Sequence, residues 1–135
     1  MSAEAHHAAV VARLKAHPSL AASVFEVGAV PTTNPPKRYV VVSSTLGNRE
    51  GYRFTGPRTQ VTTTHYLYCV GESAAQARQV SGWVDAQLVD YTLTIANRNV
   101  RRPAEWVTRP IEVDKDGPFP LPFGVIRFDL ISEPA

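Results

Sequence analysis

The stretch from Val61 to Tyr91 constrains the fold more than any other part of the chain. Residues 61–70 are rich in Val, Thr, Tyr and Leu and contain no Pro or Gly, which predicts a β-strand. Gly71 ends this run, and Ser73 with Gln76 forms a Ser-x-x-Gln sequence that predicts a capped helix start. Apolar residues then recur every three or four positions along one face: Ala77, Val80, Val84, Leu88 and Tyr91. Such a helix needs a sheet to cover.

The segments around this unit predict a two-layer α+β domain. A first helix is expected from an N-cap at Ser2 to about Ala16, because His17-Pro18 ends it. Its apolar face is expected to hold Ala3, His7, Val10, Val11 and Leu14. Residues 19–30 predict a helical turn followed by a short strand, and residues 31–36 a stiff loop.

The remaining strands complete a mostly antiparallel, mixed sheet of four to five strands with both helices on one face. The segment 38–46 is apolar on both faces and is expected to be the most buried strand. Pro110 makes the segment 105–113 an edge strand or a break. The segment 124–132 alternates with one apolar face and one mixed face, and residues 114–123 form a turn.

A long protruding hairpin arm or loop is predicted from Gly47 to Gln60, because turn residues are frequent there. Its arginines and aromatic residues are candidates for contacts: Arg49, Tyr52, Arg53, Phe54 and Arg58. Arg98, Arg101 and Arg102 form a second basic group, either a rim contact or a solvated turn. The arm is open to three interpretations: a docking arm, a plain solvated loop, or a nucleic-acid contact through stacking and phosphate pairing.

Composition fits one domain, residues 1–135, and sets limits on function. The 14 basic and 12 acidic residues nearly balance, so net charge indicates neither a nucleic-acid nor a membrane partner. The only cysteine, Cys69, excludes an internal disulfide and is expected to be buried. No leader or membrane-spanning stretch of ~20 apolar residues is recognised, so a cytoplasmic product is expected.

No catalytic, cofactor or metal site is predicted. His6 and His7 are adjacent on a helix and point apart, while His17 and His65 lie far along the chain. Cys69 and His65, on one strand, are about 13 Å apart at ~3.3 Å per residue, too far to form a nucleophile pair. The sequence Asp114-Lys115-Asp116-Gly117 resembles the start of a calcium loop but lacks the closing ligands, so a solvent turn is expected.

The layout resembles the tail terminator, or tail-completion, proteins of long-tailed bacteriophages (siphoviruses). The resemblance runs from about Glu4 to Leu130. It rests on Ala-His-Pro-Ser-Leu after the first helix, the segment 24–31, Lys-Arg-Tyr-Val-Val-Val, the Gly/Arg arm and Ser-Ala-Ala-Gln-Ala-Arg. Another head-tail neck protein of related fold would share these features.

The resemblance implies a structural, non-enzymatic virion protein without a cofactor. Its copies would form a homo-hexameric ring that caps the tail tube, stops tube polymerisation and joins the tail to the head connector. The partners would then be other copies, the tail tube protein and the connector, with genomic DNA only passing through the lumen and no membrane. The protein would act at the neck end of the tail and occur in the host cytoplasm during assembly. The alternative is a single-stranded nucleic-acid-binding module.

Overall fold

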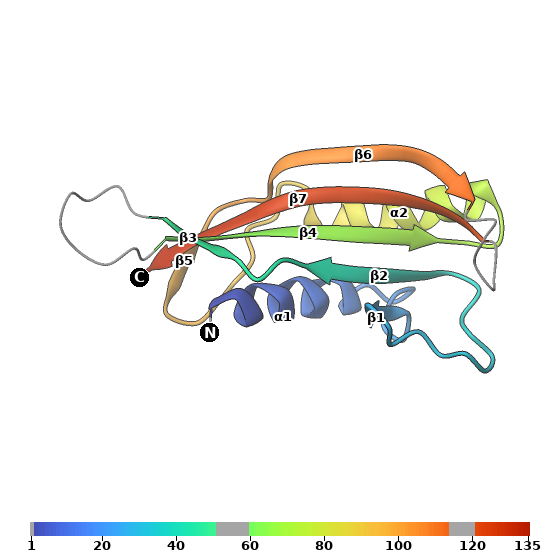
Figure 1. The fold of residues 1–135 in the computed structure, drawn as a ribbon, viewed down its shortest axis with the longest axis horizontal. Coiled ribbons are helices and arrows are strands. Elements are labelled where there is room, and N and C mark those ends of the chain that lie inside the picture. The colour runs from blue at the N-terminus through green and yellow to red at the C-terminus, as the bar shows by residue number, and fades with distance from the viewer. Residues whose placement is uncertain (1, 51–59, 114–120) are drawn as a thin grey trace.

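The computed structural model describes residues 2–50, 60–113 and 121–135. Two helices and seven strands follow one another in these residues (Figure 1). They are α1 (Ser2–Lys15), β1 (Val24–Glu26), β2 (Tyr39–Ser44), β3 (Asn48–Glu50), β4 (Gln60–Val70), α2 (Ala74–Leu88), β5 (Arg98–Val100), β6 (Ala104–Val113) and β7 (Pro122–Pro134).

The strands form one mixed sheet with the order β1-β2-β4-β7-β5. The pair β1–β2 is parallel, and every other described pairing is antiparallel. β3 pairs with the start of β4 along the same edge as β2, and β6 and β5 share the far edge of β7. Seven strands therefore fill five positions across the sheet, and the predicted α+β class is confirmed.

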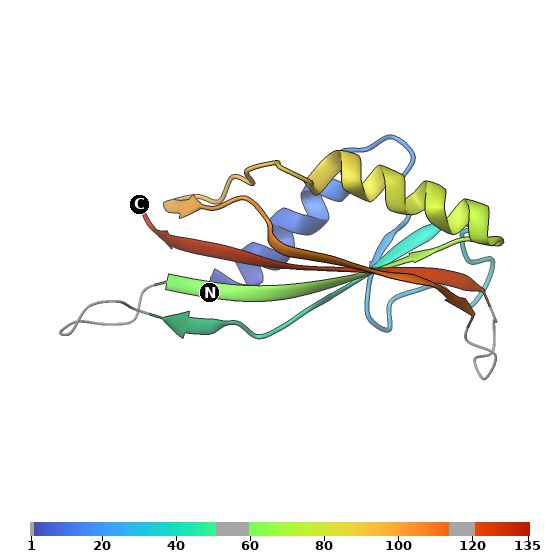
Figure 2. The ribbon, with the colours of Figure 1, turned by 90° about the horizontal axis from the view of Figure 1, so that it is seen from above.

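Both helices cover the same face of the sheet (Figure 2). α2 packs on β4 and β7, and α1 packs on β4, on β1 and on α2. Inward-facing side chains from both helices and the central strands form one core, whose largest members include Leu14, Leu67, Leu88, Ile126, Phe128 and Leu130. Within residues 2–50, 60–113 and 121–135, no helix covers the other face of the sheet.

The unit built from β4 and α2 matches its prediction closely. Ser73 caps α2, with its Oγ accepting from the Gln76 N–H at 3.2 Å. The Gln76 side chain accepts from Glu72 N–H, one residue before the cap. The stripe from Ala77 to Leu88 is buried, but the helix ends at Leu88, and Asp90 has a positive φ of 57°. Tyr91 was therefore wrongly included in the helix, and it is 39% exposed.

Three details of the remaining prediction were wrong. Ser2 lies within α1 and is not its N-cap. The innermost position of the first two turns of α1 is His6, fully buried, rather than His7. β4 is more buried than β2, because β4 lies in the middle of the sheet while, among the described strands, only the short β1 lies outside β2.

The other described segments follow the sequence except at β7, which runs from Pro122 to Pro134, so that residues 122–123 belong to this strand and not to the predicted turn. β1 follows a turn, and residues 31–36 form no regular structure. β7 alternates between a buried face and a half-exposed one. β6 is an outer strand whose register with β7 shifts between Ala104 and Val107 and again between Arg109 and Glu112. Glu105 lies at the first shift with a φ of 55°, the positive value that a bulge residue often needs.

Candidate interaction surface

The face of the sheet opposite the helices is a broad, half-exposed surface that we call the open face. Cross-strand register places its side chains in rows, because paired residues point to the same side of a sheet. One row runs Phe25, Val41, Tyr68, Val125 and Arg109 across five strands. Aromatic contacts flank it, with ring centroids 6.0 Å apart for Phe25–Tyr39 and 6.3 Å apart for Tyr68–Phe123. An apolar and aromatic surface of this kind is typical of a protein contact.

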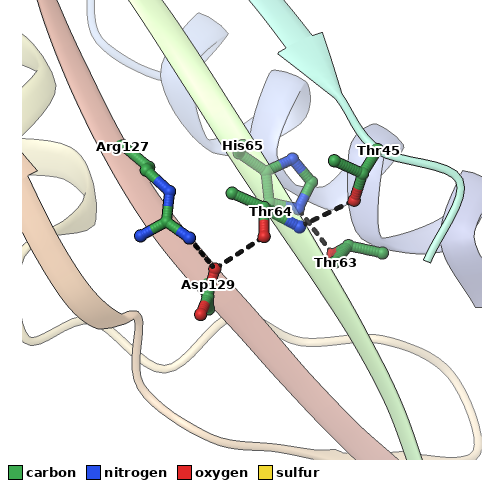
Figure 3. Close-up of polar contacts among 6 residues, drawn as sticks. All are labelled: Thr45, Thr63, Thr64, His65, Arg127 and Asp129. Carbon is green, nitrogen blue, oxygen red and sulfur yellow. Dashed lines mark hydrogen bonds and ion pairs between the residues drawn. The ribbon is translucent and has the colours of Figure 1, made fainter. Parts of the chain in front are cut away.

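Two further rows of the open face, Tyr66 with Arg127 and Thr64 with Asp129, carry charges that neutralise one another (Figure 3). Thr64 Oγ1 donates to Asp129 Oδ1 at 2.7 Å, and an Arg127 nitrogen lies 3.6 Å from the same oxygen. A hydrogen bond with Tyr66 and the charge of Asp129 raise the pKa of Arg127. The arginine charge is therefore matched within the face.

β6 offers an outer edge beside the open face. Its outward side has no strand partner in the described residues, and Val107 and Val113 are 49% and 46% exposed. A groove of about 710 Å³ separates β6 and β7 from α2, with Thr108 and Ile111 on one wall and Asp85 on the other. Pro110 and the two register shifts interrupt the edge, which protects it from indiscriminate strand pairing.

The predicted arm begins as a hairpin. β3 pairs antiparallel with β4, with Arg49 opposite Val61. Gly47 precedes it with a positive φ of 91°, and a Cβ there would lie 3.2 Å from the Thr63 side chain. The other arm candidates, Tyr52, Arg53, Phe54 and Arg58, lie outside the described residues, as does the Asp114–Gly117 sequence.

The arginines of the second basic group have different surroundings. Arg98 is half-buried, and its Nε–H donates to Ser132 Oγ at 2.7 Å. Arg101 is exposed and pairs with Glu133 at 2.7 Å. Arg102 is exposed. The predicted group therefore contained arginines with different roles. Arg98 links β5 to β7, whereas Arg101 and Arg102 face solvent.

The described residues contain no cluster of three or more His, Cys, Asp or Glu side chains that could hold a metal ion. Cys69 is fully buried, and burial followed by the charge of Asp85 raises its pKa to about 12. A thiol in this state is a poor nucleophile, since the thiolate is the reactive form. Within the same residues, neither helix is long and apolar enough to cross a membrane.

Three of the four histidines instead take part in a hydrogen-bonded chain between α1 and the sheet, which we call the histidine chain. In its inner half, Thr63 Oγ1 lies 2.7 Å from both His6 Nδ1 and His65 Nε2. His6 Nε2 lies 2.5 Å from Ser132 Oγ, which also accepts from Arg98. His6, Thr63, His65 and Ser132 are fully buried.

The outer half leads to the surface. Ser44 Oγ lies 2.7 Å from both His65 Nδ1 and His7 Nδ1. His7 Nε2 lies 2.7 Å from Glu26 Oε1, and the Glu26 side chain is 65% exposed. The chain thus begins at Arg98 in β5 and reaches Glu26 in β1, passing through β7, α1, β4 and β2.

Burial decides the protonation of the two inner rings, because a charged imidazole loses its hydration there. Desolvation, followed by the charge of Arg98, lowers the pKa of His6 from 6.5 to about 4. Desolvation, followed by the charges of His6 and His7, lowers the pKa of His65 from 6.5 to about 3. His65 also stacks on Phe128, with ring centroids 5.2 Å apart.

Sequence reasoning missed the histidine chain because it tested the histidines only for metal-ligand spacing and for pairing with Cys69. His6 lies 57 residues from Thr63 and 126 residues from Ser132, so pairing of distant strands creates the contacts. One signal was available. His65 and Thr63 lie two residues apart in the strand predicted at residues 61–70, so they point to the same side of it, and buried polar groups require partners.

Comparison with known proteins gave a structural likeness only. Protein-family models and curated proteins yielded no match. A solved chain from the virion of a native gene transfer agent particle has 20% identity and a TM-score of 0.69, covering 93% of this chain and 92% of that one. A second solved structure, of a protein without a descriptive name, has 17% identity and a TM-score of 0.64, and the match covers 100% of this chain and 96% of that one. At such identities the likeness establishes a shared fold.

Proposed function

We propose that this protein is a structural component of a phage-like virion and performs no chemistry. The observation that carries the proposal is the fold shared with the gene transfer agent virion chain over more than nine tenths of both chains. The inert, buried Cys69 and the lack of a metal-ligand cluster in the described residues are compatible with such a role. Fold alone does not determine function, so the surfaces must carry the remaining argument.

The more specific proposal is a tail terminator, whose copies close into a hexameric ring at the end of the tail tube and meet the head connector. A ring needs heterologous contacts, in which two different surfaces of each subunit fit each other. The open face and the outer edge formed by β6 are proposed as the two surfaces that meet. The arm from Gly47 to Gln60 is proposed as a further contact with a neighbour or with the last tube ring.

Charge argues against the competing proposal, a single-strand nucleic-acid platform. Such a surface combines stacking aromatic side chains with uncompensated positive charge. On the open face, Tyr66 and Tyr68 are present, but Arg127 is matched by Asp129. We therefore expect weak, salt-sensitive oligonucleotide binding at most.

The first test is the mass of the purified chain in solution, with negative-stain imaging. A concentration-dependent hexamer or a visible ring is expected. A strict monomer that binds oligonucleotides would refute the ring and favour the nucleic-acid module.

The second test locates the contact on the open face. The double variant Tyr66→Thr and Tyr68→Thr removes two aromatic rings and keeps residues that suit a strand. Tyr91→Thr is the matched control, because Tyr91 is exposed after α2 and stacks under Arg13. We expect the double variant to fold but to lose assembly by at least tenfold in midpoint concentration, while the control assembles normally. Equal assembly of both variants would exclude the open face.

The third test concerns the arm and the basic group. Deletion of residues 51–57, which leaves the three paired residues of β3 in place, should leave thermal unfolding nearly unchanged while ring formation or tail capping fails. Arg101→Ala with Arg102→Ala probes a rim contact without touching the core. Arg98 must be left intact, because its loss would remove a bond to Ser132. Unaltered assembly of either variant would remove that segment from the proposed interface.

A further inference from the structure

The histidine chain has a chemical polarity that its two ends impose. Arg98 can only donate, so Ser132 Oγ receives that hydrogen bond and has its own proton available for His6 Nε2. At the opposite end the Glu26 carboxylate can only accept, so His7 Nε2 must carry the hydrogen that faces it.

The hydroxyls transmit this direction through the interior. Each of Ser132, Thr63 and Ser44 has one proton and lies between two nitrogens, so it donates to one and accepts from the other. Starting from Arg98, every bond then points toward Glu26. His6 and His65 must carry their hydrogen on Nδ1, and His7 must carry its hydrogen on Nε2. All three rings are neutral in this arrangement, and every donor has an acceptor.

One added proton breaks the arrangement. A charged histidine donates from both nitrogens, so one neighbouring hydroxyl receives two donors and its own proton loses its acceptor. Protonation of His65 would place the defect at Thr63, and protonation of His6 would place it at Ser132. Both hydroxyls are fully buried, where an unsatisfied group is most costly. Every buried side-chain nitrogen and oxygen in the described residues is otherwise satisfied.

We infer that the histidine chain is an acid-sensitive latch, which holds α1 against the sheet while its rings are neutral and releases it when they are protonated. The chain joins α1 to β1, β2, β4 and β7, and it accounts for the polar contacts of His6 and His7. Release of α1 would uncover the core positions beneath Val10 and Leu14.

The other charged groups near the histidine chain offer no buried partner to a protonated His6 or His65. Glu4 of α1 lies beside His7 and Glu26 in a solvent-open groove of about 400 Å³. On β7, Glu133 is paired with Arg101. The residues that β2 and β7 contribute, Ser44 and Ser132, are uncharged. On the α2 side, Asp85 acts on Cys69.

The sign of the pH effect follows from the depressed pKa values. Between pH 6.5 and about 4 the unfolded protein binds protons that the folded protein excludes. The contribution of the two neutral histidines to the free energy of unfolding is therefore fully present above pH 6.5 and is lost as the pH falls. For two such histidines the unfolding equilibrium constant should rise about 50-fold between pH 6 and pH 5, and about 7-fold if only one remains.

The first experiment observes the tautomers directly. Long-range proton–nitrogen NMR of the full chain labelled at histidine, at pH 7.5, should show neutral rings with Nδ1–H at His6 and His65 and Nε2–H at His7. A cationic His6 or His65, or the opposite tautomer at either, would overturn the inference without any variant having to fold.

The second experiment measures urea unfolding at pH 6 and pH 5. His65→Gln retains one donor and one acceptor and should reduce the 50-fold change to about 7-fold. His17→Gln is the matched control, since His17 takes no part in the histidine chain and lies against Trp83. Hydrogen exchange, corrected for its intrinsic pH dependence, should show α1 losing protection before β4 as the pH falls. An unchanged pH response in His65→Gln, or α1 opening no earlier than β4, would refute the latch.

Discussion

Two glycine-to-alanine substitutions only 11 positions apart should have opposite effects on stability. Gly71 joins β4 to α2, and a Cβ built there would lie 2.6 Å from the Ala77 backbone nitrogen and 2.8 Å from the Gln76 carbonyl carbon. Both are backbone atoms of the first turn of α2, so no flexible side chain can move aside. Gly71→Ala must displace the helix start, and overpacking of this kind costs about 3 kcal/mol.

Gly82 is the matched control. It is exposed in the middle of α2, and a Cβ there would meet nothing within 4 Å. Alanine in a helix interior is favoured over glycine by about 0.5–1 kcal/mol, so Gly82→Ala should stabilise. The unfolded chain loses similar freedom in both variants, so the difference of about 4 kcal/mol reports the native clash.

Urea unfolding followed by far-ultraviolet circular dichroism measures both variants, with a common m-value as the check on two-state behaviour. A Gly71→Ala protein within about 0.5 kcal/mol of the parent, a change too small for a clash, would refute the close approach of β4 and α2. Destabilisation by Gly82→Ala would refute the assignment of that position to the exposed helix face.

Two further predictions concern the core. Phe128 is fully buried and stacks between His65 and Trp106, with centroids 5.2 and 5.3 Å away, so Phe128→Ala should lower the free energy of unfolding by about 3–5 kcal/mol. Val107→Ala on the outer strand is the control, and a Phe128→Ala loss as small as the control's would contradict the stack. Cys69, with its raised pKa, should react with a disulfide reagent at pH 8 no faster than the chain unfolds; rapid labelling of the folded protein would contradict its burial.

The sequence predicted those parts of the fold in which local pattern and tertiary environment agree. The strand β4, the Ser73 cap and the stripe from Ala77 to Leu88 depend on neighbours a few residues away, and each was confirmed. The end of α2 was misjudged, because Tyr91 continues the helical spacing while Asp90 leaves the helical conformation. Periodicity alone cannot detect such a change in backbone direction.

The polar interior could not be predicted, because its partners meet only after the strands pair. His6 was expected to point away from the apolar face of the first helix, a reasonable expectation for a polar side chain. Its burial depends on hydroxyls supplied by Thr63 and Ser132, which satisfy both ring nitrogens. The assignment of Arg98 to a surface group failed to anticipate its bond to Ser132 for the same reason.

β4 contributes residues both to the open face and to the histidine chain. Its even-numbered residues Tyr66 and Tyr68 face the open side, while Thr63 and His65 face the helices. A slip of one residue against β7 would exchange these sets, burying tyrosines and leaving the histidine chain without its central members. The alternative register therefore loses apolar packing and polar satisfaction together. The same polar contacts that make α1 sensitive to acid thus also help to fix which side of the sheet remains available to a partner.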